Sequence, residues 1–332
     1  MAKALSFSVG IPTYNQADYL EATLLSLFNQ TRPPDEIVVS DHFSTDATPQ
    51  ILAKYSNRIR IVKPPAGATF GEHWDYTISC LQGDWFTLFS SDDIAYPNFV
   101  ETLLEGATRR DDAVLVRAGW DNIDRDGHVI DQRYLLSVAP VTLPPETLLE
   151  QRYNPKVSAA AFAVRRRFMS QSGGYPIAME SFGDWPMFAQ LAPYGSFVYE
   201  AKIIAGYRMG HGGDKFRSRL AMWIRDEQRM FNEVFPLAAS RANMTDTSWI
   251  AEASRANFCR YLRSASHLLT LEECAAFVPV FEPWAISTGC DKLLELFAQG
   301  KPLPTSIKSL FTQGKKRIRP LANKVKSTLR RS

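Results

Sequence analysis

Short apolar runs and amphipathic segments alternate along the first part of the chain. Four apolar runs predict β-strands, at Ser6–Ile11, Glu36–Ser40, Ile59–Val62 and Trp85–Phe89. Segments with helical spacing of apolar residues lie between them, at Tyr19–Gln30, Pro49–Tyr55 and Trp74–Leu81. Strands that alternate with helices across short connections predict right-handed β-α-β units, and therefore a mixed, mostly parallel sheet flanked by helices.

The pattern changes after Ala113. Two extended runs between Ala113 and Tyr134 flank Asp126-Gly127, a dipeptide that favours a hairpin turn. Further extended runs at Ala159–Val164 and Phe197–Tyr207 complete the α/β part, with a helix predicted at Trp185–Leu191 between them. From about Arg217 onward the pattern is helical, and prolines such as Pro236 and Pro279 are expected to separate the helices.

The chain has 332 residues, which is more than one hydrophobic core usually holds. We expect an α/β domain over residues 1–215, a helical region over 216–300 and a basic tail over 301–332. The tail contains ten of the 38 Lys and Arg residues and none of the 35 Asp and Glu residues. It is therefore expected either to lie as an amphipathic helix on an anionic membrane surface or to be a solvated, disordered end.

Several classes of protein are disfavoured. No run of about 18 apolar residues is present, and the first residues do not resemble a secretory signal. The expected location is therefore cytoplasmic, either free or peripheral on the inner face of the membrane. The four cysteines have no C-x-x-C spacing and are expected to be reduced. Both G-x-G-x-x-G and the P-loop motif are absent. Nucleic acid is not an expected partner, because the basic tail lacks interleaved aromatic residues.

Polar residues follow three of the predicted strands, where an open parallel sheet binds ligands. They are PTYN at 12–15, the stretch that begins at Asp41, and Ser90 to Asp93. Asp92 and Asp93 are adjacent like charges, and a divalent cation that also binds substrate phosphates would stabilise such a pair. A solvated loop or a cap of the next helix, Pro97–Leu104, is the alternative for these two residues.

Five stretches in order resemble the family 2 glycosyltransferases, which have the GT-A fold. They are PTYN (12–15), VVSDHFSTD (38–46), FSSDDIAYP (89–97), SFGDWPMFAQLAPYG (181–195) and IAGYRMGH (204–211). The first three are similar to the family patterns P-[TS]-[YF]-N, V-V-D-D-G-S-x-D and L-D-x-D-D-x-x-x-P. The last two are similar to its E-D or G-D segment and its Y-R-x-H region. The resemblance covers about residues 5–211.

The resemblance implies roles for individual residues. It places the nucleotide-sugar against Pro12, Thr13, Tyr14, Asn15, Asp41, Ser91 and Asp92. Among these, Asp41 would accept a hydrogen bond from the imide N–H of uracil or thymine. Asp93 would bind Mg²⁺ or Mn²⁺, and His211 would be a further metal contact.

Asp184 is the general base that the resemblance implies. In an inverting transfer, the acceptor hydroxyl attacks C1 of the sugar from the face opposite the phosphate and gives its proton to a nearby carboxylate. The alternative is that Asp184 is the N-cap of a helix that starts at Trp185, with Pro186 at an early helical position.

Four residues depart from the family patterns. Ser90 replaces the first aspartate of D-x-D, and Ser40 stands where an aspartate is common. Gly183 precedes Asp184 where many relatives have glutamate, and His211 comes one residue later than the usual spacing. The loss of a carboxylate at Ser90 is expected to weaken metal binding when no nucleotide is present.

The expected function is therefore an inverting glycosyltransferase of the hexosyl or deoxyhexosyl type. Its donor would be a UDP- or dTDP-sugar, and its acceptor a hydroxyl of a glycan or lipid-linked molecule in surface polysaccharide or glycoconjugate biosynthesis. The alternative is a non-catalytic, nucleotide-binding scaffold with the same fold, which Ser90 favours.

Overall fold

The computed structural model describes residues 4–134, 138–209 and 214–303. The chain divides into two compact units. The first consists of Met1–His211 and Leu237–Met244, and the second of Gly212–Pro236 and Thr245–Ser332. The predicted site residue His211 and nearly all of the basic tail lie outside the described residues.

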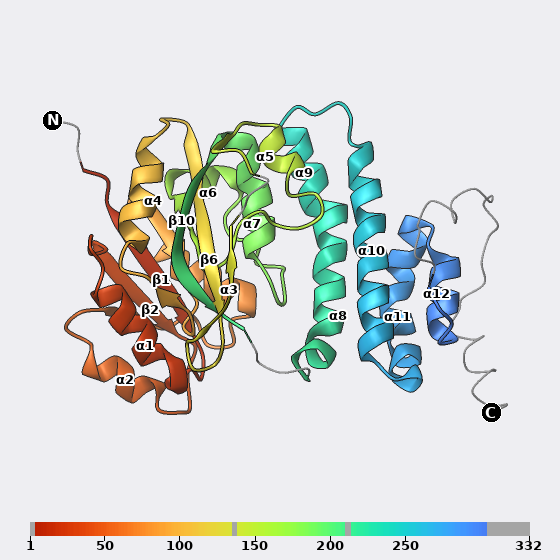
Figure 1. The fold of residues 1–332 in the computed structure, drawn as a ribbon, viewed down its shortest axis with the longest axis horizontal. Coiled ribbons are helices and arrows are strands. Elements are labelled where there is room, and N and C mark those ends of the chain that lie inside the picture. Colours follow the sequence, from red (N-terminus) through yellow and green to blue (C-terminus); the bar gives the residue numbers. More distant parts are fainter. Residues whose placement is uncertain (1–3, 135–137, 210–213, 304–332) are drawn as a thin grey trace. The chain divides into compact units, whose positions relative to one another are not determined.

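A ten-stranded mixed sheet forms the centre of the first unit (Figure 1). Its strands are β1 (Phe7–Thr13), β2 (Glu36–Asp41), β3 (Arg60–Val62), β4 (Trp85–Leu88), β5 (Ile94–Ala95), β6 (Ala113–Ile123), β7 (Val129–Arg133), β8 (Val141–Thr142), β9 (Phe162–Arg165) and β10 (Ser196–Arg208). The order across the sheet is β3-β2-β1-β4-β9-β6-β10-β5, with β7 paired to β6 and β8 to β10.

The sheet combines parallel and antiparallel pairs. β3, β2, β1 and β4 are parallel neighbours, as the alternation of strands and helices predicts, and β6 and β10 are also parallel. β9 lies between β4 and β6 and is antiparallel to both. The prediction of a mixed, mostly parallel sheet flanked by helices is confirmed.

The helices of the first unit connect these strands. They are α1 (Ala17–Phe28), α2 (Thr48–Lys54), α3 (Phe70–Ser79), α4 (Phe99–Thr108), α5 (Glu146–Leu149), α6 (Arg167–Ser172) and α7 (Asp184–Leu191), followed by a 3₁₀ turn (Ala192–Tyr194). α3 begins four residues before the predicted start, because Thr69 and Glu72 form a capping box that fixes its N-terminus.

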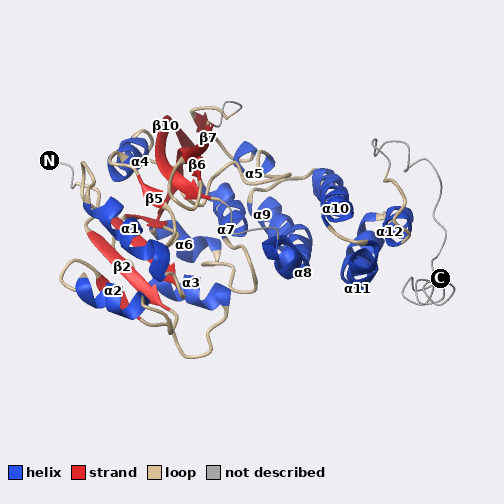
Figure 2. Cartoon of the chain, turned by 60° about the horizontal axis from the view of Figure 1, so that its bottom comes forward, coloured by secondary structure: helices blue, strands red, loops and turns tan. Residues whose placement is uncertain are grey.

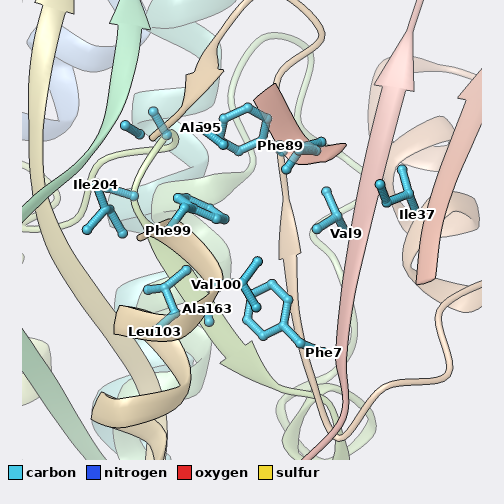
Figure 3. Packing of buried hydrophobic residues seen from close by; sticks show 14 of the residues in the cluster. Phe7, Val9, Ile37, Phe89, Ala95, Phe99, Val100, Leu103, Ala163 and Ile204 are labelled. Atoms are coloured by element: carbon cyan, nitrogen blue, oxygen red, sulfur yellow. The ribbon is translucent and has the colours of Figure 1, made fainter. Parts of the chain in front are cut away.

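Alternate residues of β1 face opposite sides of the sheet. Val9 belongs to the apolar cluster that includes residues of α1 and α4, among them Leu24 and Phe99, and Figure 3 shows Phe99 beside Phe89 in this core. On the other face, a Cβ at Gly10 would lie 3.1 Å from the side chain of Thr77 in α3. The sheet is therefore covered by helices on both faces.

The predicted hairpin at Asp126-Gly127 is confirmed. β6 and β7 pair antiparallel around this turn, and Gly127 has a φ of +92°, a conformation that favours glycine. β9 starts at Phe162, three residues after the predicted start, because Ser158 accepts a turn hydrogen bond from the backbone N–H of Ala161.

The described part of the second unit is helical (Figure 2). It contains α8 (Asp214–Arg229), a π-helical segment (Met230–Val234), α10 (Ser248–Leu268), α11 (Leu271–Thr288) and α12 (Asp291–Ala298), while α9 (Phe235–Arg241) passes from this unit into the first. Pro279 does not separate two helices as predicted, since α11 continues through it. Burial of Val278, Phe281 and Trp284 on one face of α11 stabilises the helix despite the lost backbone bond.

Within the described ranges, no helix is both long and apolar enough to span a bilayer. All four cysteines are free thiols, and three of them are buried.

Candidate functional site

The ends of β1 and β2 bring two predicted donor-binding segments together. The two strands are parallel neighbours, with Pro12 opposite Ser40 and Thr13 opposite Asp41. Thr13 and Asp41 are each only 2% exposed. The Asp41 Oδ1 accepts a hydrogen bond from the backbone N–H of Ser44 at 3.1 Å, which holds the carboxylate at the strand end.

Hydrogen bonds tie the loops after these strands to each other. The backbone N–H of Asn15 donates to the Ser44 hydroxyl at 2.9 Å, and the Asn15 side-chain oxygen accepts from the N–H of Thr45 at 2.8 Å. Tyr14 is 55% exposed and lies edge-on to His42, with ring centroids 6.0 Å apart. An exposed aromatic ring at a strand end is available to stack on a nucleobase.

Phe43 adopts a left-handed conformation, with a φ of +58°. This region strongly favours glycine, the residue that the family pattern V-V-D-D-G-S has in this loop. The conformation aligns Phe43 with that glycine, so Asp41 and His42 align with the two aspartates. In this alignment His42 stands where the pattern has its second aspartate, and Phe43 stands where it has glycine.

A buried histidine contacts the end of β2 from the face of the sheet that α3 covers. His73 of α3 donates from Nε2 to the backbone carbonyl of Ser40 at 3.0 Å. Its ring lies 4.8 Å from that of His42. Burial lowers the pKa of His73 from 6.5 to about 4, so the ring is neutral at pH 7.

The turn after β4 carries the two adjacent carboxylates. The Thr23 hydroxyl of α1 lies 3.1 Å from the carbonyl of Ser91 and 2.8 Å from that of Asp93, which anchors the turn. Asp93 is 1% exposed and Asp92 is half-buried. Burial, followed by the charge of Asp92, raises the pKa of Asp93 well above its usual value.

Arg208 at the end of β10 connects this turn to the β6–β7 hairpin. Its backbone N–H donates to Asp93 Oδ1 at 2.8 Å, and its Nε donates to the carbonyl of Asp92 at 2.7 Å. Its Nη1 donates to the carbonyls of Asp124 and Arg125. Arg208 thus holds the carboxylate turn in place through backbone groups, a role that depends on contacts between distant segments and that the sequence does not reveal.

The carboxylate turn fits a divalent cation. Asp93 Oδ2 is buried and makes no hydrogen bond to a described residue. A buried carboxylate oxygen without a partner is stabilised by a cation or a proton. The neighbouring Asp92 supplies a second, more accessible carboxylate, and Mg²⁺ commonly uses one or two carboxylates together with substrate phosphates.

A second acidic cluster lies in the β6–β7 turn. Oxygen and nitrogen atoms of Asp124, Asp126 and His128 lie within 4.8 Å of one another. The sequence predicts only a hairpin turn at Asp126-Gly127 here. Asp124 Oδ1 accepts hydrogen bonds from the backbone N–H groups of Asp126 and His128, both at 2.9 Å, so the arrangement is explained by closure of this exposed turn.

Asp184 is the first residue of α7, and the N-cap is Gly183. The alternative role of Asp184 as the N-cap is therefore wrong, because the backbone turns into the helix one residue earlier. Burial raises the pKa of the Asp184 carboxyl, and a hydrogen bond from the backbone of Trp185 partly offsets this effect. A carboxylate with a raised pKa is a stronger proton acceptor. Trp185 itself is 4% exposed and donates to the carbonyl of Gln151, so it belongs to the core.

The absence of a side chain at residue 183 has a steric reason. A Cβ on Gly183 would lie 2.1 Å from the hydroxyl oxygen of Tyr175. The Tyr175 ring stacks on Trp74 of α3, with centroids 5.8 Å apart, and its backbone N–H donates to Asp75. Tyr175 therefore fills the space where a residue larger than glycine would have to fit.

The sequence and the fold agree on one class of protein. The family model described as Glycosyl transferase family 2 matches residues 8–173, half of the chain. Crystal structures of Staphylococcus aureus TarS are similar, with a TM-score of 0.61 and 17% identity over 89% of this chain and 53% of that chain. For TarS 1–349 in complex with UDP the TM-score is 0.58, over 89% of this chain and 88% of that one. The fold is therefore the GT-A fold, and the chain belongs to glycosyl transferase family 2.

Curated relatives match over shorter regions. An uncharacterized glycosyltransferase of Rickettsia typhi is 31% identical over 42% of this chain and 45% of that protein. The hyaluronan synthase of Pasteurella multocida is 26% identical over 65% of this chain and 21% of its own length. The chain thus spans less than half the length of either relative.

Proposed function

We propose that this chain is an inverting glycosyltransferase that uses a UDP- or dTDP-sugar, with the donor bound across the ends of β2, β1 and β4. The observation that carries the proposal is that Asp41 ends β2 and the Asp92–Asp93 turn follows β4, and that both strands are parallel neighbours of β1 in a family 2 chain. Parallel neighbours end at one edge of the sheet, so one ligand can reach both groups.

The nucleoside occupies the β1–β2 side of this edge in the proposal. Asp41 accepts from the imide N–H of the base, Tyr14 stacks on it, and the backbone of Pro12, Thr13 and Asn15 lines its edge. The crystal structures of TarS with UDP and with UDP-GlcNAc support a uridine nucleotide, since these two ligands are bound by proteins of the same fold.

The diphosphate lies toward the turn after β4, beside Ser91. Asp93 and the more accessible Asp92 would hold Mg²⁺ or Mn²⁺ there, and Arg208 holds the turn through its hydrogen bonds to both residues. A bound cation would offset the negative charge on the leaving nucleoside diphosphate. Because Ser90 offers no carboxylate, binding of the cation would depend on the substrate phosphates.

Asp184 acts as the general base in the proposal. As the acceptor oxygen attacks C1 of the sugar, its proton moves to the Asp184 carboxylate, and the bonding electron pair of the C1–O bond leaves with the diphosphate. The raised pKa of Asp184 suits this role, because a carboxylate at its ordinary pKa is a weaker base.

The acceptor is proposed to be a hydroxyl of a glycan or lipid-linked molecule in surface polysaccharide or glycoconjugate biosynthesis. The similarity to a hyaluronan synthase and to a chondroitin synthase supports a glycan acceptor. A cytoplasmic location, with the basic tail on the inner face of the membrane, remains a prediction from the sequence.

The test is a mass-spectrometric screen for nucleotide release from UDP-, dTDP- and GDP-sugars, with and without Mn²⁺. We expect turnover with a UDP- or dTDP-sugar, and a loss of about 10²- to 10⁴-fold in Asp184→Asn with UDP affinity unchanged. Asp291→Asn, which alters an aspartate in the first turn of α12, is the matched control. UDP binding without turnover on any donor would support the non-catalytic scaffold instead.

A further inference from the structure

Three consecutive arginines line a cavity at the edge of the sheet opposite the donor site. Arg165, Arg166 and Arg167, together with Leu5 and Asp84, surround a cavity of about 210 Å³. Leu5 precedes β1 and Asp84 precedes β4, whereas the proposed donor-binding residues lie at or beyond the C-terminal ends of the strands. Because β1 and β4 are parallel, the cavity and the donor site lie at opposite ends of the same strands.

The sheet brings the three arginines to this edge. β9 runs antiparallel to β4, so its last residue, Arg165, pairs with Trp85 at the start of β4. Arg165 Nη1 donates to the carbonyl of Asp111 at 2.6 Å, and Arg166 Nε donates to the carbonyl of Gly83 at 2.7 Å. These bonds to backbone carbonyls orient the guanidinium groups and do not neutralise them.

The positive charge at the cavity is poorly balanced. None of the three arginines forms an ion pair with another residue in the described ranges. Among the described residues that line the cavity, Asp84 is the acid, and its Oδ2 accepts hydrogen bonds from the backbone N–H and hydroxyl of Ser6. The charges of Asp84 and Asp111 both act on Arg165, so two carboxylates offset three guanidinium groups.

The arginines also affect one another. Burial, and then the positive charge of Arg167, lowers the pKa of Arg165. The central guanidinium carbons of two arginines lie over aromatic rings, that of Arg165 at 5.8 Å from the Trp85 centroid and that of Arg167 at 4.8 Å from the Phe168 centroid. An anion in the cavity would relieve the repulsion and use N–H donors that have no partner among the described residues.

We propose that this cavity is a binding site for a phosphoryl group, separate from the donor site. Guanidinium groups bind phosphate oxygens in pairs through parallel N–H donors, and an anion offsets the positive charge that the neighbouring carboxylates leave unbalanced. The volume exceeds that of one phosphate, so the site accommodates the phosphate end of a larger ester. The group can belong to a soluble phosphate ester or to a lipid headgroup.

The experiment uses the full chain and two probes. Pyrophosphate without divalent cation is titrated by calorimetry at low salt, and sedimentation measures binding to phosphatidylcholine vesicles with and without phosphatidic acid. The test variant is Arg166→Ala/Arg167→Ala, since both side chains are exposed. The matched control, Arg32→Ala/Arg58→Ala, makes the same change in charge elsewhere in the first unit.

We expect the test variant to bind pyrophosphate at least about tenfold more weakly than the wild type. The affinity of the control variant should lie within about twofold of the wild-type value. Arg167→Glu, which removes no hydrogen bond to a described residue, should show the same loss. A parallel loss of binding to phosphatidic acid vesicles identifies a headgroup, whereas a loss with pyrophosphate alone identifies a soluble ester. Equal affinities of wild type, test variants and control for both probes would overturn the proposal.

UDP binding in the presence of Mn²⁺ is measured on the same variants. We expect it to be unchanged, because the variants lie at the other end of the sheet. The outcome for the arginine cavity is therefore independent of whether the proposed transferase activity is found.

Discussion

His73 makes the stability of this protein depend on pH, and the effect can be calculated from its environment. The ring is 6% exposed, and among the described residues its hydrogen-bond partners are the carbonyl and hydroxyl of Ser40. Its pKa is about 4 in the folded chain and 6.5 in the unfolded chain. Between these values the unfolded chain binds a proton that the folded chain does not, so stability falls as the pH is lowered through this window.

The magnitude follows from the two pKa values. Each pH unit within the window costs about 1.4 kcal/mol, so about 2 kcal/mol of the free energy of unfolding is lost between pH 7.5 and pH 5.0. His73→Gln keeps an amide that can donate to Ser40 but does not titrate. The variant is expected to be less stable than the wild type at pH 7.5, and this difference should shrink by about 2 kcal/mol at pH 5.0.

Urea unfolding at the two pH values measures this difference. His267→Gln, on the exposed side of α10, is the matched control for the substitution. If the stability difference between wild type and His73→Gln is the same at pH 7.5 and pH 5.0 within about 0.5 kcal/mol, the reasoning about the buried neutral ring is refuted.

Three further predictions concern other buried groups. Burial raises the pKa of Glu227 from 4.5 to about 7, so stability is lost as the pH rises through this range. In thermal unfolding, Glu227→Gln should be more stable than the wild type by about 1 to 3 kcal/mol at pH 8. At pH 4.5 the variant should show no such gain. Arg208→Lys should lower stability by about 2 to 4 kcal/mol and weaken UDP binding in calorimetry, since it loses hydrogen bonds to three backbone carbonyls of the carboxylate turn and the β6–β7 hairpin. Unchanged affinity for UDP would contradict the role proposed for Arg208. Gly183→Ala should reduce donor turnover by about 10- to 100-fold, because its clash with Tyr175 would displace the neighbouring Asp184. Full activity of the variant would contradict this reasoning.

The sequence predicted the elements whose signals are local. The four parallel strands are short apolar runs between helical segments, and the β6–β7 hairpin has an Asp-Gly turn. The position of β9 between β4 and β6 was not predicted. Its pairing joins residues about 50 to 80 positions apart, and periodicity within one segment carries no information about such partners.

In the candidate site, too, local signals were predicted from the sequence and contacts between distant segments were not. The order of motifs placed Asp41 and Asp93 at strand ends, but the burial of Asp93 depends on Arg208, which lies 115 residues further along the chain. The glycine before Asp184 reads as a departure from a pattern in the sequence, whereas in the fold it is required by the ring of Tyr175. Contacts between distant segments decide both features.

The stereochemistry of the reaction tests the central proposal most directly. With water as the acceptor, proton NMR of the sugar released from the UDP- or dTDP-sugar that shows turnover identifies the first anomer formed, before it equilibrates in solution. A base at Asp184 and a single displacement predict the anomer opposite to that of the donor, and loss of the signal in Asp184→Asn. Release of the same anomer as the donor would contradict the proposed mechanism.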